Sequence, residues 1–345
     1  MPNSKLPKSP RILATTVGSY PVPDWLAALP SQQALADATR VVFKTQEMAG
    51  IDVVADGELY RFDVNHPDTN GMIEYFTRPM SGIRSAITRA DIGAFAKLEG
   101  MGFRSEPAGV VEGPVGEGTL NLPRDYRRAR SLTRHTMKFT LTGPHMLCKT
   151  LMDRHYKTRP ELAMAIGRAL AAQVAEIDPD VLQVDEANIT GHPDEADWAA
   201  DAINLVLDGC TRAKERGVHM CFGNYGGQSI QRGMWAKLLG FLNRLHCDHV
   251  VLEFAFRGYD ELAHFKDGLD PRIGLGVGVI DIKVNTVETP EEVARRIETA
   301  ARIVGAEPIN WVHPDCGFWM NKRSIADRKM EALVKGRDLY LGRTS

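Results

Sequence analysis

The chain has 345 residues, 43% of them hydrophobic and 25% charged, which is an ordinary composition for a globular protein with a sizeable core. Its formal net charge of -2 argues against a general nucleic-acid partner, because neutralising phosphates requires a basic surface. No apolar run approaches the roughly 20 residues that span a bilayer, so we also expect no membrane partner.

The N-terminus and the cysteines indicate where the protein works. Residues 1–10 are basic and proline-containing and lead into no apolar signal segment, so we predict a disordered tail there. The five cysteines are odd in number and scattered, which does not suggest a disulfide framework. We therefore expect a reducing, cytoplasmic location, in which any special cysteine serves metal binding or chemistry.

Short apolar segments alternate with longer amphipathic ones from about residue 11 onward. The short segments have the length and composition of strands, namely Ile12–Val17, Asp52–Ala55, Met137–Thr142, Val181–Asp185, Val218–Phe222, His249–Phe254, Ile273–Val279 and Ile309–Val312. Helical patterns lie between most of them, at Gln32–Ala49, Pro160–Ile177, Glu195–Asp208, Met234–Leu245, Asp260–Lys266 and Ile325–Tyr340. A further helix is expected to begin at Thr289, with Glu292 placed to complete a capping box.

Eight strands, mostly each followed by a helix, predict an α/β fold of the (β/α)8 TIM-barrel type over residues 11–345. A doubly wound open sheet uses the same units, but no Gly-x-Gly-x-x-Gly turn follows the first strand. Residues 66–134 break the alternation with polar and glycine-rich stretches. We predict that they form an excursion after the second strand and lie over the barrel mouth.

Residues that suit zinc lie at the predicted ends of three strands. His219 and Cys221 alternate along the fifth strand and so share one face, although a buried polar pair is the simpler alternative. Glu253 is the one acid in the apolar sixth strand, where a buried carboxylate needs a cation unless it pairs with Arg257. Cys316 follows the eighth strand at a tight turn. Because strand ends meet at one face of a barrel, these four residues predict a zinc site.

Other predicted strand ends are polar as well. They are Gly18–Ser19, Asp56–Glu58, Asp185–Glu186 and Asp281–Lys283. Paired acids could bind an ammonium group, while Ser19 and free backbone N–H groups could bind a carboxylate, which together describe an amino-acid pocket beside the metal. The alternative is that barrel mouths are polar because their loops are solvated.

Six motifs resemble those of the catalytic C-terminal barrel of cobalamin-independent methionine synthase, in the same order over nearly the whole chain. They are Thr15–Pro21, Asp56–Glu58, Val184–Ala187, His219–Cys221, Leu252–Ala255 and His313–Gly317. The resemblance implies a short, single-barrel form of a zinc-dependent methyltransferase that converts homocysteine to methionine.

The resemblance also assigns residues to roles. It makes His219, Cys221, Glu253 and Cys316 the zinc ligands, and it makes Gly18, Ser19, Glu58 and Asp185 contacts to the amino-acid part of homocysteine. We name Lys283, Asp281 and Glu186 as candidate catalytic residues. Lys283 stands where the family has a catalytic histidine, and it could contact a donor group or neutralise Asp281.

The methyl donor is the part of the reaction that the resemblance does not carry over. The folate-stacking tryptophan of the family follows a Gly-Pro after the third strand, whereas residues 143–150 of this chain contain no such aromatic residue. We therefore keep two donors open, methyltetrahydrofolate and a methyl-corrinoid protein.

Three other functions fit parts of the pattern. An epoxyalkane:coenzyme M transferase would share the zinc and the barrel but would need arginines for a sulfonate where Glu58 and Asp185 lie. A metal-free barrel related to uroporphyrinogen decarboxylase would lack the His-x-Cys pair. A non-catalytic zinc module that hands on methyl groups within a complex would have a closed site with four ligands.

Overall fold

The computed structural model describes residues 12–63, 71–98, 104–224 and 229–343, so the predicted tail at residues 1–10 lies outside the described residues. Eight parallel strands form one curled sheet in the order β1-β11-β10-β9-β8-β7-β5-β2. They are β1 (Leu13–Ala14), β2 (Val54–Ala55), β5 (Met137–Thr142), β7 (Val181–Asp185), β8 (Glu215–Met220), β9 (His249–Leu252), β10 (Gly274–Ile280) and β11 (Ile309–Pro314).

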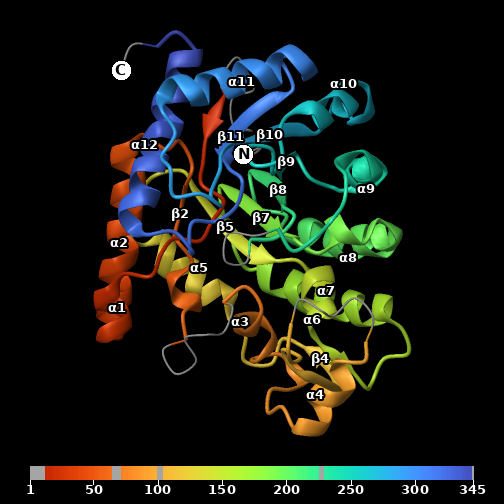
Figure 1. The fold of residues 1–345 in the computed structure, drawn as a ribbon. Coiled ribbons are helices and arrows are strands. Elements are labelled where there is room, and N and C mark those ends of the chain that lie inside the picture. The colour runs from red at the N-terminus through yellow and green to blue at the C-terminus, as the bar shows by residue number, and fades with distance from the viewer. Residues whose placement is uncertain (1–11, 64–70, 99–103, 225–228, 344–345) are drawn as a thin grey trace.

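The two edges of this sheet meet. Parallel bridges join Thr15 to Val53 and Ser19 to Gly57, in the segments that follow β1 and flank β2. The first and last long helices, α2 (Gln32–Ala49) and α12 (Arg323–Tyr340), also pack together, and Figure 1 shows them side by side in red and blue. The predicted α/β barrel is therefore confirmed.

Helices cover the outside of the strands (Figure 1). Beside α2 and α12 they are α1 (Asp24–Ala28), α6 (Pro144–Thr150), α7 (Arg159–Val174), α8 (Ala196–Gly209), α9 (Leu239–Arg244), α10 (Phe265–Gly268) and α11 (Pro290–Val304). The capping box predicted at Thr289 and Glu292 is present at the start of α11. Among the described residues, no helix is long and apolar enough to cross a membrane.

Several predicted segments differ from the structure near the strand ends. The predicted sixth strand His249–Phe254 ends at Leu252, so Glu253 lies just beyond it. β8 begins and ends before the predicted Val218–Phe222, so Cys221 lies just beyond the strand. The predicted helix Met234–Leu245 starts instead with a 3-10 turn over Trp235–Leu238, whose buried tryptophan donates from its indole to the carbonyl of Glu253 at 3.1 Å. That hydrogen bond holds the turn against the end of β9.

The excursion after the second strand has secondary structure of its own. After the 3-10 turn η1 (Leu59–Arg61) that follows β2, it contains α3 (Glu74–Thr77), β3 (Ser81–Arg84), α4 (Arg89–Phe95), β4 (Val110–Gly116) and α5 (Leu122–Arg130). β4 pairs antiparallel with β3 and parallel with β6 (Met152–Asp153), which follows β5 and α6. Figure 1 shows this small sheet at the lower end of the view, beside α6 and α7. Its boundaries at residues 66 and 134 stay a prediction.

A buried lysine ties α12 to the loop after β10. The Lys329 ammonium is 0% exposed and donates to the Glu288 carboxylate at 2.8 Å and to the carbonyls of Asp281 at 2.8 Å and Thr286 at 2.6 Å. We expect Lys329→Met to lower the free energy of unfolding by about 3 kcal/mol, because it leaves a buried carboxylate with a weaker counter-charge. Urea denaturation followed by circular dichroism measures this loss.

Lys335 provides the matched control, because it lies on the same helix with a side chain that is 56% exposed. Lys335→Met should change the stability by no more than about 0.5 kcal/mol, as is usual for an exposed site. Equal effects of the two substitutions on the free energy of unfolding would show that the buried Lys329 charge does not stabilise the fold.

Candidate metal centre and active site

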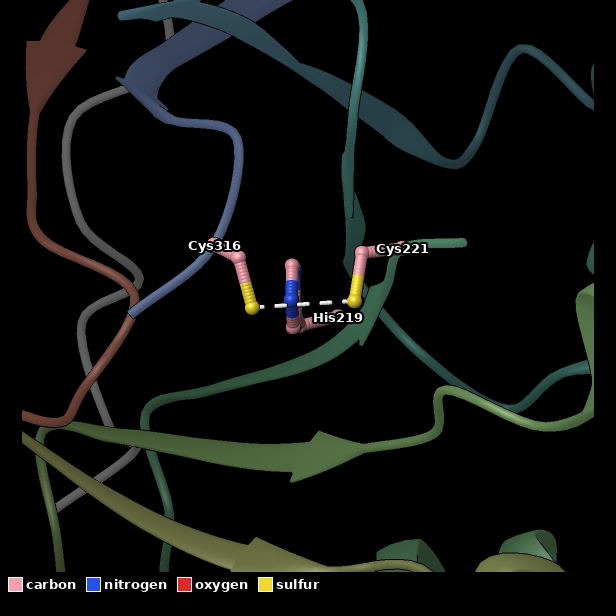
Figure 2. Close-up of side chains that lie close together, drawn as sticks. All are labelled: His219, Cys221 and Cys316. Atoms are coloured by element: carbon pink, nitrogen blue, oxygen red, sulfur yellow. Dashed lines mark hydrogen bonds between the residues drawn. The ribbon is translucent and has the colours of Figure 1, made fainter. Parts of the chain in front are cut away.

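Three side chains that can ligate a metal converge at the C-terminal end of the barrel (Figure 2). A ring nitrogen of His219 and the sulfurs of Cys221 and Cys316 all lie within 4.8 Å of one another. The two sulfurs are 3.6 Å apart. His219 belongs to β8, Cys221 follows that strand, and Cys316 follows β11, so the curled sheet brings together residues far apart in the chain.

The hydrogen bonds of His219 leave one ring nitrogen free for a metal. Its Nδ1 lies 3.0 Å from the carbonyl oxygen of Val251, which can only accept, so Nδ1 carries the proton. Its Nε2 is buried and has no hydrogen-bond partner in the part of the chain that the structure describes. Two sulfurs each about 2.3 Å from a tetrahedral zinc lie about 3.8 Å apart, close to the separation found here. The cluster fits zinc.

Glu253 lies beside this cluster but does not join it in the described ranges. Its Oε1 accepts from the Lys283 ammonium at 2.6 Å, and its Oε2 accepts from the backbone N–H of Phe222 at 2.9 Å. Arg257, the partner weighed from the sequence, pairs with Glu261 at 2.8 Å instead. Burial alone lowers the pKa of Lys283, but the Glu253 carboxylate outweighs it and raises that pKa above its ordinary value.

The predicted substrate contacts share one cavity with the cluster. Ser19, Glu58 and Asp185 line a cavity of about 510 Å³ together with the three metal-ligating side chains. Residues 72–74 and 104–106 of the excursion line the same cavity. A Cβ atom on Gly18 would collide with the Glu58 carboxylate, so only glycine lets the chain pass this close. The structure thus brings the predicted amino-acid pocket and the cluster together.

Glu58 is held in a strained backbone conformation. Its φ of 59° makes it the one non-glycine residue with positive φ in the described part of the chain. Its carboxylate accepts from the Thr140 hydroxyl at 2.5 Å and pairs with the Arg61 guanidinium at 3.0 Å. Such strain is often found at functional positions. Sequence reasoning missed Arg61, although its position three residues after Glu58 suits a partner on one helical turn.

A chain of polar side chains runs beneath the pocket inside the barrel. Gln183 donates to the Asp185 carboxylate at 2.7 Å and accepts from the Lys138 ammonium at 2.8 Å. Lys138 also donates to the carbonyl of Thr16. Burial lowers the pKa of Lys138 to about 7 and raises the pKa of Asp185 to about 6. Neither Lys138 nor Gln183 was singled out from the sequence, where both fall inside apolar strand segments.

Comparison with known proteins connects this site to a family. The family profile described as the catalytic domain of cobalamin-independent synthase matches residues 12–336. The chain belongs to this family. A methionine synthase of Sulfurisphaera tokodaii is 28% identical over 95% of this chain and 92% of its own length. One from Thermococcus kodakarensis is also 28% identical, over 95% of this chain and 93% of its own.

Solved structures show the same fold. A B12-independent methionine synthase from Shewanella sp. W3-18-1, solved in complex with selenomethionine, superposes with a TM-score of 0.78 at 24% identity over 96% of this chain and 98% of that one. A putative vitamin-B12 independent methionine synthase from Listeria monocytogenes gives a TM-score of 0.66 at 18% identity, over 95% of this chain and 97% of that one. At these identities the likeness concerns the barrel alone.

This member of the cobalamin-independent synthase family has a buried histidine just after Gly143 and Pro144. The ring of His145 lies between two carboxylates, 3.1 Å from Glu186 and 2.7 Å from Glu195. Burial lowers the pKa of His145, but the two carboxylates outweigh it and raise that pKa above its ordinary value. The His145 ring is fully buried, so it offers no exposed face at this position.

The predicted catalytic residues of this synthase-family chain have other partners. Glu186 lines the cavity, but its carboxylate accepts from His145 and from the backbone N–H of Met146 at 2.9 Å. Lys283 and Asp281 do not line the cavity. Asp281 accepts from the backbone N–H of Lys283 at 2.8 Å, whereas the Lys283 ammonium goes to Glu253. These catalytic assignments stay predictions.

Proposed function

We propose that this chain is a zinc-dependent methyltransferase that moves a methyl group to the thiol of homocysteine and so forms methionine. The observation that carries the proposal is the shared cavity, lined both by His219, Cys221 and Cys316 and by the acids Glu58 and Asp185. A thiol-activating centre thus lies beside groups suited to an amino acid. The names of the curated relatives, which match over more than nine tenths of their length, support the same reaction.

One set of cavity residues would act on the thiol of the substrate, and another set would bind its ammonium and carboxylate groups. Nε2 of His219 and the sulfurs of Cys221 and Cys316 would hold the ion, which when bound would lower the pKa of a thiol from its usual value of about 8.5. Asp185, next to the cluster, accepts from the substrate ammonium, and the Gly18–Ser19 backbone, of which Ser19 lines the cavity, receives the carboxylate. The substrate sulfur is then held beside the donor, where a sulfur–methyl bond forms as the donor–methyl bond breaks.

The environment of Glu58 and Asp185 argues against a sulfonate thiol as the substrate. A sulfonate needs a cation, and the arginine nearest to these acids, Arg61, is already paired with Glu58 and donates to the carbonyl of Thr140. Because Glu58 is paired with Arg61, Asp185 is the acid that favours a substrate carrying an ammonium group. This supports homocysteine over coenzyme M.

The donor is the second part of the proposal. A buried His145 follows the Gly-Pro after β5, so the position at which the family has its folate-stacking tryptophan offers no exposed ring here. We therefore expect a methyl-corrinoid donor rather than methyltetrahydrofolate.

The test offers the zinc-loaded protein one donor at a time with homocysteine and measures methionine by mass spectrometry. Methylcobalamin should support turnover, while methyltetrahydrofolate, as mono- or polyglutamate, should give none. Turnover with methyltetrahydrofolate but not with methylcobalamin would show that the proposed donor is wrong, while homocysteine would remain the acceptor. Alkylation of coenzyme M by an epoxide, with homocysteine ignored, would overturn the proposed function.

A further inference from the structure

We propose that Lys138 and Gln183 are positioning residues that hold the two halves of the amino-acid pocket in place. Both are buried inside the barrel, and neither lines the cavity. Gln183 donates to Asp185, where the substrate ammonium is expected, and to the chain just before the Gly18–Ser19 segment, where the carboxylate is expected. This role rests on the proposed homocysteine-dependent function and names the residues that shape its acceptor site.

The contacts of Gln183 decide which way its amide group faces. Nε2 lies 2.7 Å from Oδ1 of Asp185 and 2.8 Å from the carbonyl oxygen of Val17. Because a carbonyl oxygen can only accept, Nε2 with its two N–H groups faces Val17 and Asp185, and Oε1 faces Lys138. The Lys138 ammonium donates to Oε1 at 2.8 Å. Both N–H groups and the oxygen of this amide are therefore engaged.

Lys138 holds the same segment at a second point. Its ammonium also donates to the carbonyl of Thr16, the residue before Val17. Lys138 and Gln183 belong to the neighbouring strands β5 and β7. Thr16 and Val17 follow β1, on the other side of β2. The pair thus links the strand end of the expected ammonium site to the strand end of the expected carboxylate site.

A fixed Val17 carbonyl also fixes the group that follows it. This carbonyl and the Gly18 N–H belong to one planar peptide group, so they point in opposite directions and turn together. The Ser19 carbonyl is held as well, because it accepts from the backbone N–H of Phe318 at 2.9 Å. The peptide groups on both sides of the one that joins Gly18 to Ser19 are therefore in place before a substrate carboxylate arrives.

Stability alone gives no reason for this pair. The interior layers of such barrels are usually filled by branched apolar side chains. Lys138 is 2% exposed and Gln183 is 0% exposed, and a buried charge with its partners is seldom more stabilising than apolar residues of the same volume. An apolar pair would fill the layer, but it would leave Asp185 and the Val17 carbonyl without this donor. The contacts with the pocket therefore explain the pair.

The binding of four thiols to the zinc-loaded full chain, measured by isothermal titration calorimetry, tests this role. Homocysteine carries both groups, 4-mercaptobutanoate only the carboxylate, 3-aminopropane-1-thiol only the ammonium, and propane-1-thiol neither. Gln183→Met has a similar volume but no N–H donor. It should weaken homocysteine binding by about tenfold or more and the binding of each one-group thiol by about threefold or more. The dissociation constant for propane-1-thiol should change by less than about twofold, because this thiol contacts only the metal end of the pocket.

Two further variants separate hydrogen-bond donation from the filling of space. Gln183→Glu keeps the shape and can still accept from Lys138, but it places an oxygen against Asp185 and the Val17 carbonyl. We expect it to weaken homocysteine binding at least as much as Gln183→Met does. Lys138→Met should act in the same direction, because the Gln183 amide and the Thr16 carbonyl both lose their donor.

Gln173→Met is the matched control. Gln173 is also a buried glutamine, but it lies on α7 outside the barrel, where its Oε1 accepts from the backbone N–H of Leu122 at 2.8 Å. This variant should leave all four dissociation constants unchanged. Zinc content, measured for every variant, should stay that of the native chain, since neither Lys138 nor Gln183 belongs to the cluster.

The outcomes distinguish this role from the proposed function. If Gln183→Met and Gln183→Glu both change homocysteine binding by less than about twofold, the role is wrong while the function stands. Equal weakening of all four thiols would locate the effect in the metal centre or the fold, and a loss confined to one of the two one-group thiols would mean that only one half of the pocket is held. Either result would overturn the role. If the native chain bound homocysteine no more tightly than propane-1-thiol, the proposed function would fall and this role with it.

Discussion

Cys316→Ser is expected to abolish both stoichiometric zinc binding and methionine formation. Its sulfur lies 3.6 Å from that of Cys221 and within 4.8 Å of the free ring nitrogen of His219, so serine removes one of three ligand atoms. Loss of a group that merely orients a ligand lowers metal affinity by about 10- to 100-fold, so loss of a ligand should exceed that. Metal analysis after dialysis and the methionine assay measure the two effects.

Cys247→Ser is the matched control for this substitution. Cys247 is also a free cysteine, but it precedes β9 at the opposite end of the barrel and does not belong to the cluster. The Cys247→Ser variant should keep the zinc content and the activity of the native chain. Retention of both properties by Cys316→Ser would remove the central claim.

Asp185→Asn is expected to lower kcat/KM for homocysteine by roughly 30- to 1000-fold, corresponding to a loss of about 2–4 kcal/mol when one partner of a buried charge pair is neutralised. Asp185 is 2% exposed and lines the cavity beside the cluster, so it is placed to meet the substrate ammonium. Asparagine keeps its shape and can still accept from Gln183. Steady-state kinetics with the preferred donor measures the change.

A second thiol makes this test specific. 4-Mercaptobutanoate has the chain and carboxylate of homocysteine but no amino group, so it cannot form the contact with Asp185. The native chain should use it poorly, and Asp185→Asn should use it about equally well. If Asp185→Asn lost the same factor with both thiols, its effect would lie in the fold or the metal centre rather than in ammonium recognition.

The barrel could be predicted from the sequence because each of its strands and helices is marked by a local pattern of residues. Each strand is a short apolar segment between turns, and each helix has a stripe or a cap, such as the capping box of Thr289 and Glu292. The cluster could also be predicted, because strand ends of a parallel barrel meet at one face whatever the details of packing. His219, Cys221 and Cys316 needed only that rule.

The partners of the charged groups could not be predicted in the same way. Glu253 and Lys283 are 30 residues apart on neighbouring strand ends, whereas Arg257, only four residues from Glu253, was the obvious candidate. Which cation reaches the carboxylate depends on side-chain directions that a one-dimensional pattern does not contain. The same holds for His145, because its second carboxylate partner, Glu195, comes from a 3-10 turn (Pro193–Glu195) after β7.

The distance in sequence between the two cysteines of the cluster has a consequence for folding. Cys221 and Cys316 are 95 residues apart, and the strands β9, β10 and β11 lie between them. An ion held by both would act as a removable cross-link over that span, which in the chain-entropy treatment of a disulfide corresponds to about 4–5 kcal/mol. The same ion that activates the substrate would thus hold the last part of the barrel closed, so supply of the metal and persistence of the folded protein would rise and fall together.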